Sequence, residues 1–271
     1  MKEIKDQTII ITGATDGIGK IAALKLARQN AHIVIHGRRK EKVEAVVKEL
    51  IENTANKKID GWTADLSSLE EVKRSGAAIL AKYPSIDVFI NNAGVGFADT
   101  GKSREGYELR FAVNYLAPFL LTKLVLPAIK HAAPSRIVNV SSAGQAPVNF
   151  DHFIPKDSID PVLTYRESKL ALIMFTIDLA EEVRQYGVTV NSLHPGTYLN
   201  TNMVRNAKIK PMGDAESGAD AEVFLATSPS LNNVTGKYFN VTKEARALPQ
   251  AYDPQVRWQL RNYSMDLINT K

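Results

Sequence analysis

Tyr165 and Lys169 are the residues of this sequence whose types and spacing most directly suggest chemistry. They lie four positions apart in a segment of helical period, so both side chains project from one face of the helix and can approach a common ligand. A free tyrosine has a pKa of about 10, and a neighbouring ammonium group lowers it by favouring the phenolate. We therefore expect Tyr165 to exchange protons as a general acid/base, with Lys169 tuning it.

A glycine-rich segment, Thr12 to Gly19, lies directly between the first apolar β-branched run and the first run of helical period. Gly13 permits a tight turn, Gly17 lets a pyrophosphate approach the backbone, and Gly19 lets the helix pack closely on the strand. The N-terminus of the helix supplies free N–H donors to phosphate oxygens. This placement indicates a dinucleotide site rather than an ordinary strand-to-helix turn.

Short apolar runs alternate with longer runs of helical period along the chain, and this βαβ rhythm favours right-handed crossovers. Strands that are apolar throughout indicate a parallel sheet covered on both faces. We therefore predict a single α/β domain over residues 1–271, a doubly wound parallel sheet of Rossmann type with about seven strands. The predicted strands are 8–12, 32–36, 59–63, 86–90, 136–140, 188–193 and 237–241, and the predicted helices are 17–30, 40–53, 68–82, 103–131 in two stretches, 163–186 and 219–227.

Composition excludes several classes of protein. The chain has no cysteine, which rules out a disulfide framework, a thiolate nucleophile and cysteine-ligated zinc, so we expect no metal site. The net charge of +5 comes from scattered basic residues, so we expect no nucleic-acid partner. No uninterrupted apolar run reaches the roughly 18 residues of a membrane span, and we expect a cytoplasmic protein without a span.

The series of motifs resembles the short-chain dehydrogenase/reductase family over most of the chain. The glycine spacing, three residues and then one, is similar to that family's rather than to the more widespread dinucleotide fingerprint. In the family's order there follow Asp65-Leu66, Asn91-Asn92-Ala93-Gly94, Asn114, Ser141-Ser142, Tyr165 with Lys169, and Pro195-Gly196. A long interval before Tyr165, and His194 before Pro195, resemble the retinol-dehydrogenase-like branch, although we assign His194 no catalytic work.

The resemblance implies an oxidoreductase that moves a hydride between a nicotinamide and a carbonyl or alcohol carbon. Ser142 would hold the substrate oxygen, and the preceding Ser141 is the less favoured alternative. Tyr165 would be the general acid/base, and Lys169 would also bind the nicotinamide ribose. Asn114 would bend its helix and hold a water in the proton path to Lys169.

The resemblance also implies the cofactor site. Relatives often carry an acidic residue at the end of the second strand, but Gly37 stands there, followed by Arg38 and Arg39, which can grip a 2′-phosphate. NADP(H) is therefore favoured over NAD(H), although Asp16 stands where some NADP-dependent relatives are basic. The expected cofactor-binding residues are Gly13, Thr15, Asp16, Gly17, Ile18, Gly19, Arg38, Arg39, Asp65, Leu66, Asn92, Ala93, Gly94, Tyr165, Lys169, Pro195, Gly196 and Thr201, the last displaced by one extra residue.

Two other classes of protein stay open. A catalytically silent, NADP-bound regulator or scaffold would keep the fold without turnover, and the intact Tyr165, Lys169 and Ser142 argue against it. A methyltransferase also has a glycine-rich loop after its first strand, but it would leave Tyr165 and Lys169 unexplained.

Two irregular stretches, 144–162 and 196–217, follow predicted strands on the ligand side of the sheet, and we expect them to form the substrate loops. They carry no charge constellation that identifies the carbonyl or alcohol substrate. The resemblance further implies a homodimer or homotetramer that pairs two long helices. Four apolar residues could serve that contact or simply face the sheet, namely Leu120, Leu124, Leu172 and Phe175.

Overall fold

Eight strands form one sheet in the order β3-β2-β1-β4-β5-β6-β7-β8. The computed structural model describes residues 1–269, and its strands are β1 (Thr8–Ile11), β2 (His32–Gly37), β3 (Ile59–Thr63), β4 (Val88–Asn91), β5 (Ser135–Val140), β6 (Val188–His194), β7 (Tyr238–Asn240) and β8 (Lys243–Ala245). Strands β1 to β7 pair in parallel, and β8 runs antiparallel to β7. The order turns back between β1 and β4, where a doubly wound sheet opens its ligand crevice. The predicted fold class is confirmed.

The central strands are built from residues that suit a sheet buried on both faces. Ile9, Ile10 and Ile11 of β1 have no exposed surface, and neither have Val34 and Ile35 of β2. β-Branched side chains at successive positions pack against helices on both sides of the sheet. For this reason, each of these strands is a continuous run of apolar residues in the sequence.

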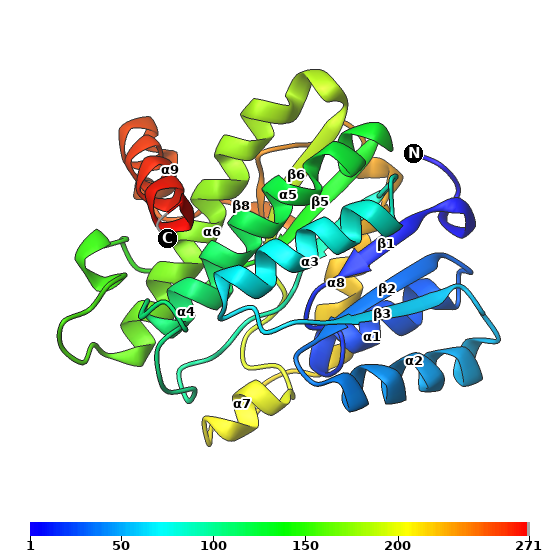
Figure 1. Ribbon diagram of the computed structural model, residues 1–271, viewed down its shortest axis with the longest axis horizontal. Coiled ribbons are helices and arrows are strands. Elements are labelled where there is room, and N and C mark those ends of the chain that lie inside the picture. The colour runs from blue at the N-terminus through cyan, green and yellow to red at the C-terminus, as the bar shows by residue number, and fades with distance from the viewer. Residues whose placement is uncertain (270–271) are drawn as a thin grey trace.

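Helices cover both faces of the sheet (Figure 1). They are α1 (Gly17–Ala27), α2 (Lys40–Thr54), α3 (Leu69–Lys82), α4 (Leu109–Phe111), α5 (Ala117–His131), α6 (Pro161–Val183), α7 (Asn202–Asn206), α8 (Ala215–Thr227) and α9 (Pro254–Asn269). Helices α1, α2 and α8 enclose one apolar core against the sheet, and α3, α5, α6 and α9 enclose a second. These two cores hold the strand ends, and the loops that follow them, in defined positions.

The helix predicted over 103–131 begins later than expected. A turn with Gly106 at a φ of +87° precedes it. The helix begins at Leu109, where the Glu108 carboxylate caps it by accepting a hydrogen bond from a backbone N–H at 2.8 Å. The expected break into two stretches is a π-helical turn, Ala112–Leu116, between α4 and α5.

Two features near the C-terminus differ from the prediction. The region 237–241 leads into two short strands, β7 and β8, so the sheet has eight strands rather than about seven. Helix α9 was not predicted, because its buried face mixes apolar Leu260 and Leu267 with polar Arg257 and Ser264. Polar residues on the buried face weaken the apolar periodicity that identifies a helix.

The stretch Leu109–His131 is long and apolar enough, by length and composition, to cross a membrane, with a mean hydropathy of 1.5. No membrane-spanning segment was expected from the sequence, because no uninterrupted apolar run is long enough. In the structure 83% of its most apolar window is buried within the fold. Packing in the second apolar core accounts for its composition.

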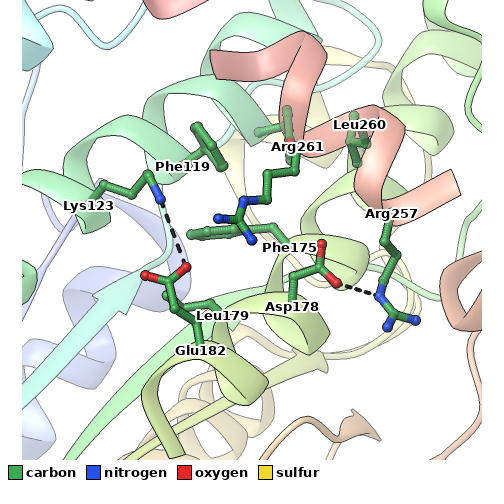
Figure 2. Close-up of a pocket in the computed structure, with 10 residues that line it drawn as sticks. Phe119, Lys123, Phe175, Asp178, Leu179, Glu182, Arg257, Leu260 and Arg261 are labelled. Carbon is green, nitrogen blue, oxygen red and sulfur yellow. Dashed lines mark hydrogen bonds and ion pairs between the residues drawn. The ribbon is translucent and has the colours of Figure 1, made fainter. Parts of the chain in front are cut away.

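Helix α9 packs against α6 (Figure 2). Arg257 of α9 points toward Asp178 of α6, with 2.5 Å between Nε and Oδ1. Farther along α9, the hydroxyl groups of Ser264 and Tyr115 share a hydrogen bond of 2.8 Å. Ion pairs of Arg257 with Asp178 and Glu181, and buried hydrogen bonds of Tyr115 and Tyr107, therefore fasten the C-terminal helix to the body of the fold.

The four side chains expected to contact a second copy pack inside the chain instead. Leu120, Leu172 and Phe175 are buried in the second apolar core, and Leu124 packs over Gly76 of α3. These side chains are therefore occupied within one chain. Assembly into a homodimer or homotetramer stays a prediction.

Candidate active site

A cavity of about 880 Å³ lies at the carboxyl edge of the sheet, at the switch point between β1 and β4. Its walls come from the segments that follow β1 to β6, together with parts of α6 and α7. Ligand sites of doubly wound sheets occur at this edge, and the volume lies in the upper part of the range for small-molecule and cofactor sites.

Most of the predicted site residues line this cavity. They are Gly13, Thr15, Asp16, Gly17, Ile18, Arg38, Asp65, Leu66, Asn92, Ala93, Gly94, Ser142, Tyr165, Lys169, Pro195, Gly196 and Thr201. Gly19, Arg39 and Asn114 do not line it. Gly19 and Asn114 are buried in the structure around the cavity, whereas Arg39 is an exposed residue before α2.

The glycine turn is shaped by close backbone packing. Gly13 has a φ of +65°, and a Cβ atom there would lie 2.7 Å from the Cα of Ala93, so only glycine fits without a shift. A Cβ on Gly19 would overlap the amide of Asn92. That amide donates to the carbonyl oxygens of Thr12 at 2.7 Å and of Gly13 at 3.0 Å. Asn92 therefore ties the end of β4 to the turn.

His36, near the end of β2, is a site residue that the sequence argument missed. Its Nδ1 accepts a hydrogen bond from the backbone N–H of Gly13 at 3.1 Å, and its Nε2 lies 3.0 Å from the carbonyl oxygen of Ala64. The neutral ring with its proton on Nε2 satisfies both contacts. Burial lowers the pKa of His36 to about 4. A histidine at a strand end has no sequence signal for this role.

We expect His36 to make the folded state sensitive to acid. Unfolded, it binds a proton near pH 6.5, but folded only near pH 4. Its stabilising effect is therefore complete above pH 6.5 and is lost as the pH falls from 6.5 to 4, a change of about 3 kcal/mol. In urea titrations across this window, His36→Gln should flatten the fall in the free energy of unfolding. The exposed His131→Gln is the control, and equal slopes for wild type and His36→Gln would refute this assignment.

Asp16 is paired within the protein. Its Oδ1 accepts from the backbone N–H of Gly17 at 2.8 Å, its Oδ2 lies 3.4 Å from Nζ of Lys42, and Asn202 also donates to it. Burial opposes ionisation, but the contacts from Asn202, Gly17 and Lys42 together lower the pKa of Asp16. The negative charge of Asp16, which was expected to disfavour the 2′-phosphate of NADP(H), is therefore partly balanced by Lys42.

Gly37 leaves no room for a side chain. A Cβ atom there would overlap the methyl group of Thr15 and lie 2.9 Å from Cγ2 of Val43. The carboxylate that many relatives carry at the end of the second strand does not fit here without movement of these neighbours. The next residue, Arg38, is exposed and lines the cavity.

Tyr165 and Lys169 lie one turn apart on α6, and both line the cavity. Nζ of Lys169 lies 5.7 Å from the centre of the Tyr165 ring and donates to the carbonyl oxygen of Val140 at 2.9 Å. Burial lowers the pKa of Lys169 to about 8. The end of β5 thus positions the ammonium group beside the phenol.

Burial of the phenol raises the pKa of Tyr165, and a hydrogen bond with Ser142 opposes this rise. The ammonium group of Lys169 is engaged by the carbonyl oxygen of Val140. The expectation that Lys169 favours the phenolate together with a positively charged nicotinamide stays a prediction.

The two adjacent serines at the end of β5 have different surroundings. The Ser141 hydroxyl donates to the backbone carbonyl of Lys169 at 2.7 Å and anchors α6 to the sheet. The Ser142 hydroxyl accepts from the backbone N–H of Gly144 at 3.0 Å and keeps its own proton available to Tyr165 or to a ligand. This difference favours Ser142 as the residue that meets substrate.

Asn114 lies in the π-helical turn Ala112–Leu116, a kind of bulge that is frequent at functional sites. Its Oδ1 accepts from the backbone N–H of Val95 at 2.8 Å, and its Nδ2 donates to the carbonyl oxygen of Val95 and to the hydroxyl of Ser168, both at 3.1 Å. A Cβ on Gly94 would lie 3.3 Å from Oδ1 of Asn114. Asn114 thus links the segment after β4 to the catalytic helix.

The two predicted substrate loops are fixed to the fold. In the first, the ring of His152 lies 3.0 Å from the buried Glu167 carboxylate of α6. In the second, Gly196 has a φ of +138°, and the methyl group of Thr201 lies near Gly17. The second loop therefore closes over the glycine turn.

A glycine turn at one helix N-terminus and a tyrosine–lysine pair on another helix, on a doubly wound sheet, define a dinucleotide-binding oxidoreductase. A family model described as short chain dehydrogenase matches residues 7–211. The chain belongs to the short-chain dehydrogenase family, and its curated relatives include retinol dehydrogenases. The predicted family resemblance is confirmed.

The relatives cover nearly the whole chain. Retinol dehydrogenase 13 of Homo sapiens is 34% identical over 98% of this chain and 85% of that protein. A solved structure of an uncharacterised Mycobacterium paratuberculosis protein has a TM-score of 0.80 at 25% identity, over 98% of this chain and 94% of that one. A short-chain dehydrogenase from Shigella flexneri 2a str. 301, solved with NADP, has a TM-score of 0.69 at 25% identity, over 89% and 99%.

Proposed function

We propose that the chain transfers a hydride between NADP(H) and a carbonyl or alcohol carbon, with Tyr165 as general acid/base. The observation that carries this proposal is that Tyr165, Ser142 and Lys169 share one cavity with the glycine turn and Arg38. A scaffold without turnover would not need a serine hydroxyl bonded to a buried phenol. An assay of NADPH oxidation against a panel of carbonyl compounds tests it, and cofactor binding without turnover of any compound would favour the scaffold.

The reaction assigns one task to each side chain. When bound, the nicotinamide supplies the hydride in reduction and takes it in oxidation. Ser142 donates a hydrogen bond to the substrate oxygen, and Tyr165 gives that oxygen its proton in reduction or removes it in oxidation. Lys169 would bind the ribose hydroxyls of the cofactor and, as a cation beside the phenol, would favour its phenolate form. Asn114 binds the backbone of Val95 and so holds the segment after β4 beside Lys169. Protons would be returned to Lys169 at this place.

The cavity favours an apolar substrate. Its wall beside the phenol includes the Phe97 ring, which meets the Tyr165 ring edge-on at 5.8 Å between centroids. The same cavity is lined by Leu109, Val113, Val162, Met203, Val204 and Ile209. Apolar side chains with few polar groups bind an extended hydrocarbon and leave its one oxygen to Ser142 and Tyr165. In the assay panel, apolar aldehydes should therefore have a higher kcat/KM than open-chain sugars.

NADP(H) should bind more tightly than NAD(H), and Arg38→Ala should remove most of this preference. A hydrogen-bonded charge pair contributes about 1.5 kcal/mol at a partly exposed site, so the ratio of the two Kd values should fall by about tenfold. Titration calorimetry with each cofactor measures it. Arg28→Ala is the control, because Arg28 is an exposed arginine at the end of α1 that does not line the cavity. Equal affinities in the unmodified protein, or an equal loss in Arg28→Ala, would contradict the assignment.

A further inference from the structure

Glu222 of α8 is a buried acid that the proposed reaction does not use. Its side chain has no exposed surface, and neither carboxyl oxygen has a hydrogen-bond partner among residues 1–269. An ionised carboxylate in such a place is strongly disfavoured, because nothing replaces its lost hydration. Burial accordingly raises the pKa of Glu222 to about 8. The group is therefore a neutral acid at pH 7.

Glu222 approaches the site from the face of the sheet opposite α6. Helix α8 packs against α1, β5 and β6, and its residues Ala221 and Leu225 share an apolar core with Val140. Val140 is also the residue whose carbonyl oxygen binds Nζ of Lys169. Glu222 does not line the cavity. It can therefore act on the reaction through Lys169 but not by touching substrate.

Lys169 is the charge that matters for Glu222. Burial has the largest effect on the pKa of Glu222, and Lys169 has the next largest and lowers it. Glu222 in turn raises the pKa of Lys169. From β6, His194 has its pKa lowered by burial and by Lys169, so it is neutral. From β5, Arg136 donates to the backbone carbonyls of Leu225 and Ser228 at the C-terminal end of α8, which begins about one turn beyond Glu222. From α1, Lys25 pairs with exposed acids of α8.

We propose that Glu222 is a positioning residue that stores a proton beneath the reaction centre and releases it as the pH rises, so that Lys169 keeps its own proton. The released proton goes to solvent, and the carboxylate left behind stabilises the ammonium group. The effect on turnover rests on the function proposed above, whereas the proton storage itself does not. If an apolar residue replaced Glu222, Lys169 would lose its proton at a lower pH.

The proton storage is tested on the protein alone. In carbon-13 NMR titrations of labelled glutamate carboxyl groups, one resonance should titrate near pH 8. It should disappear in Glu222→Gln and persist in the control Glu216→Gln, which removes an exposed acid of the same helix. A Glu222 resonance that titrates below about pH 5 would overturn the proposal.

The coupling to Lys169 is tested by lysine side-chain NMR in the same variants. The pKa of Lys169 should fall in Glu222→Gln and in Glu222→Leu by roughly half to one unit, because each variant removes a charge that acts on the ammonium group without a hydrogen bond to it. Glu222→Leu fills an apolar core and should melt at least as high as wild type, so it guards against a folding defect of the glutamine variant. An unchanged Lys169 pKa in both variants would overturn the proposal.

The consequence for turnover is measured last. The alkaline limb of the profile of kcat/KM against pH should move to lower pH by roughly the same half to one unit in Glu222→Gln and stay in place in Glu216→Gln. A limb that does not move, although Lys169 has shifted, would overturn the positioning role. If no carbonyl compound turns over but both NMR results hold, the proposed function fails and the proton storage stands.

Discussion

Tyr165→Phe is expected to lower kcat for the best carbonyl substrate by about two to four powers of ten and to leave NADPH affinity almost unchanged. The variant keeps the ring that packs against Phe97 but loses the hydroxyl that exchanges the proton. Proton transfer contributes in the transition state and not to cofactor binding, so kcat falls while the Kd stays. Loss of the hydroxyl also removes a buried polar group, so the variant should fold normally.

Single-turnover kinetics of NADPH oxidation, together with fluorescence titration of NADPH, measure the two effects separately. Tyr186→Phe is the control, because Tyr186 is an exposed tyrosine just beyond α6. If Tyr165→Phe keeps near-normal turnover while the chemical step limits the rate, another group supplies the proton.

Lys169→Ala is expected to reduce both turnover and cofactor affinity, in contrast to Tyr165→Phe. The loss of charge-assisted hydrogen bonds to the ribose should raise the Kd for NADP(H) by about ten- to a hundredfold. The loss of the ammonium group beside the phenol should lower kcat by about two powers of ten or more, because the phenolate form of Tyr165 then lacks its cation. Both effects have one origin, since Nζ is held at the end of β5 by Val140.

The same two measurements test this variant. Lys123→Ala is the control, because Lys123 is a lysine of α5 that pairs with Glu182 away from the cavity. A Lys169→Ala protein with unchanged cofactor affinity would show that the ribose is bound by other groups. In that case, the effect of Glu222 and Lys169 on the phenol would have to be explained without a contact between Lys169 and the ribose.

The local sequence determined the order of the strands and helices along the chain and the segments that carry the ligand-binding and reactive residues. Successive β-branched residues favour strands buried on both faces, and the tight turn after β1, where Gly13 has a φ of +65°, favours glycine through its local backbone conformation. The spacing of Tyr165 and Lys169 on one helix face follows from helix geometry alone. These features depend on residues close together in the chain, so pattern and spacing were sufficient to predict them.

Tertiary structure decided the features that depend on residues far apart in the chain. His36 bonds to Gly13 just after the neighbouring strand, and Glu222 influences the pKa of Lys169 from the opposite face of the sheet without a hydrogen bond to it. Helix α9 is defined by its contacts with α6 rather than by its own periodicity. A protonation state depends on burial and on nearby charges, neither of which is written in local sequence. For that reason the position of Tyr165 could be predicted from the sequence, whereas the rise that burial causes in its pKa could not.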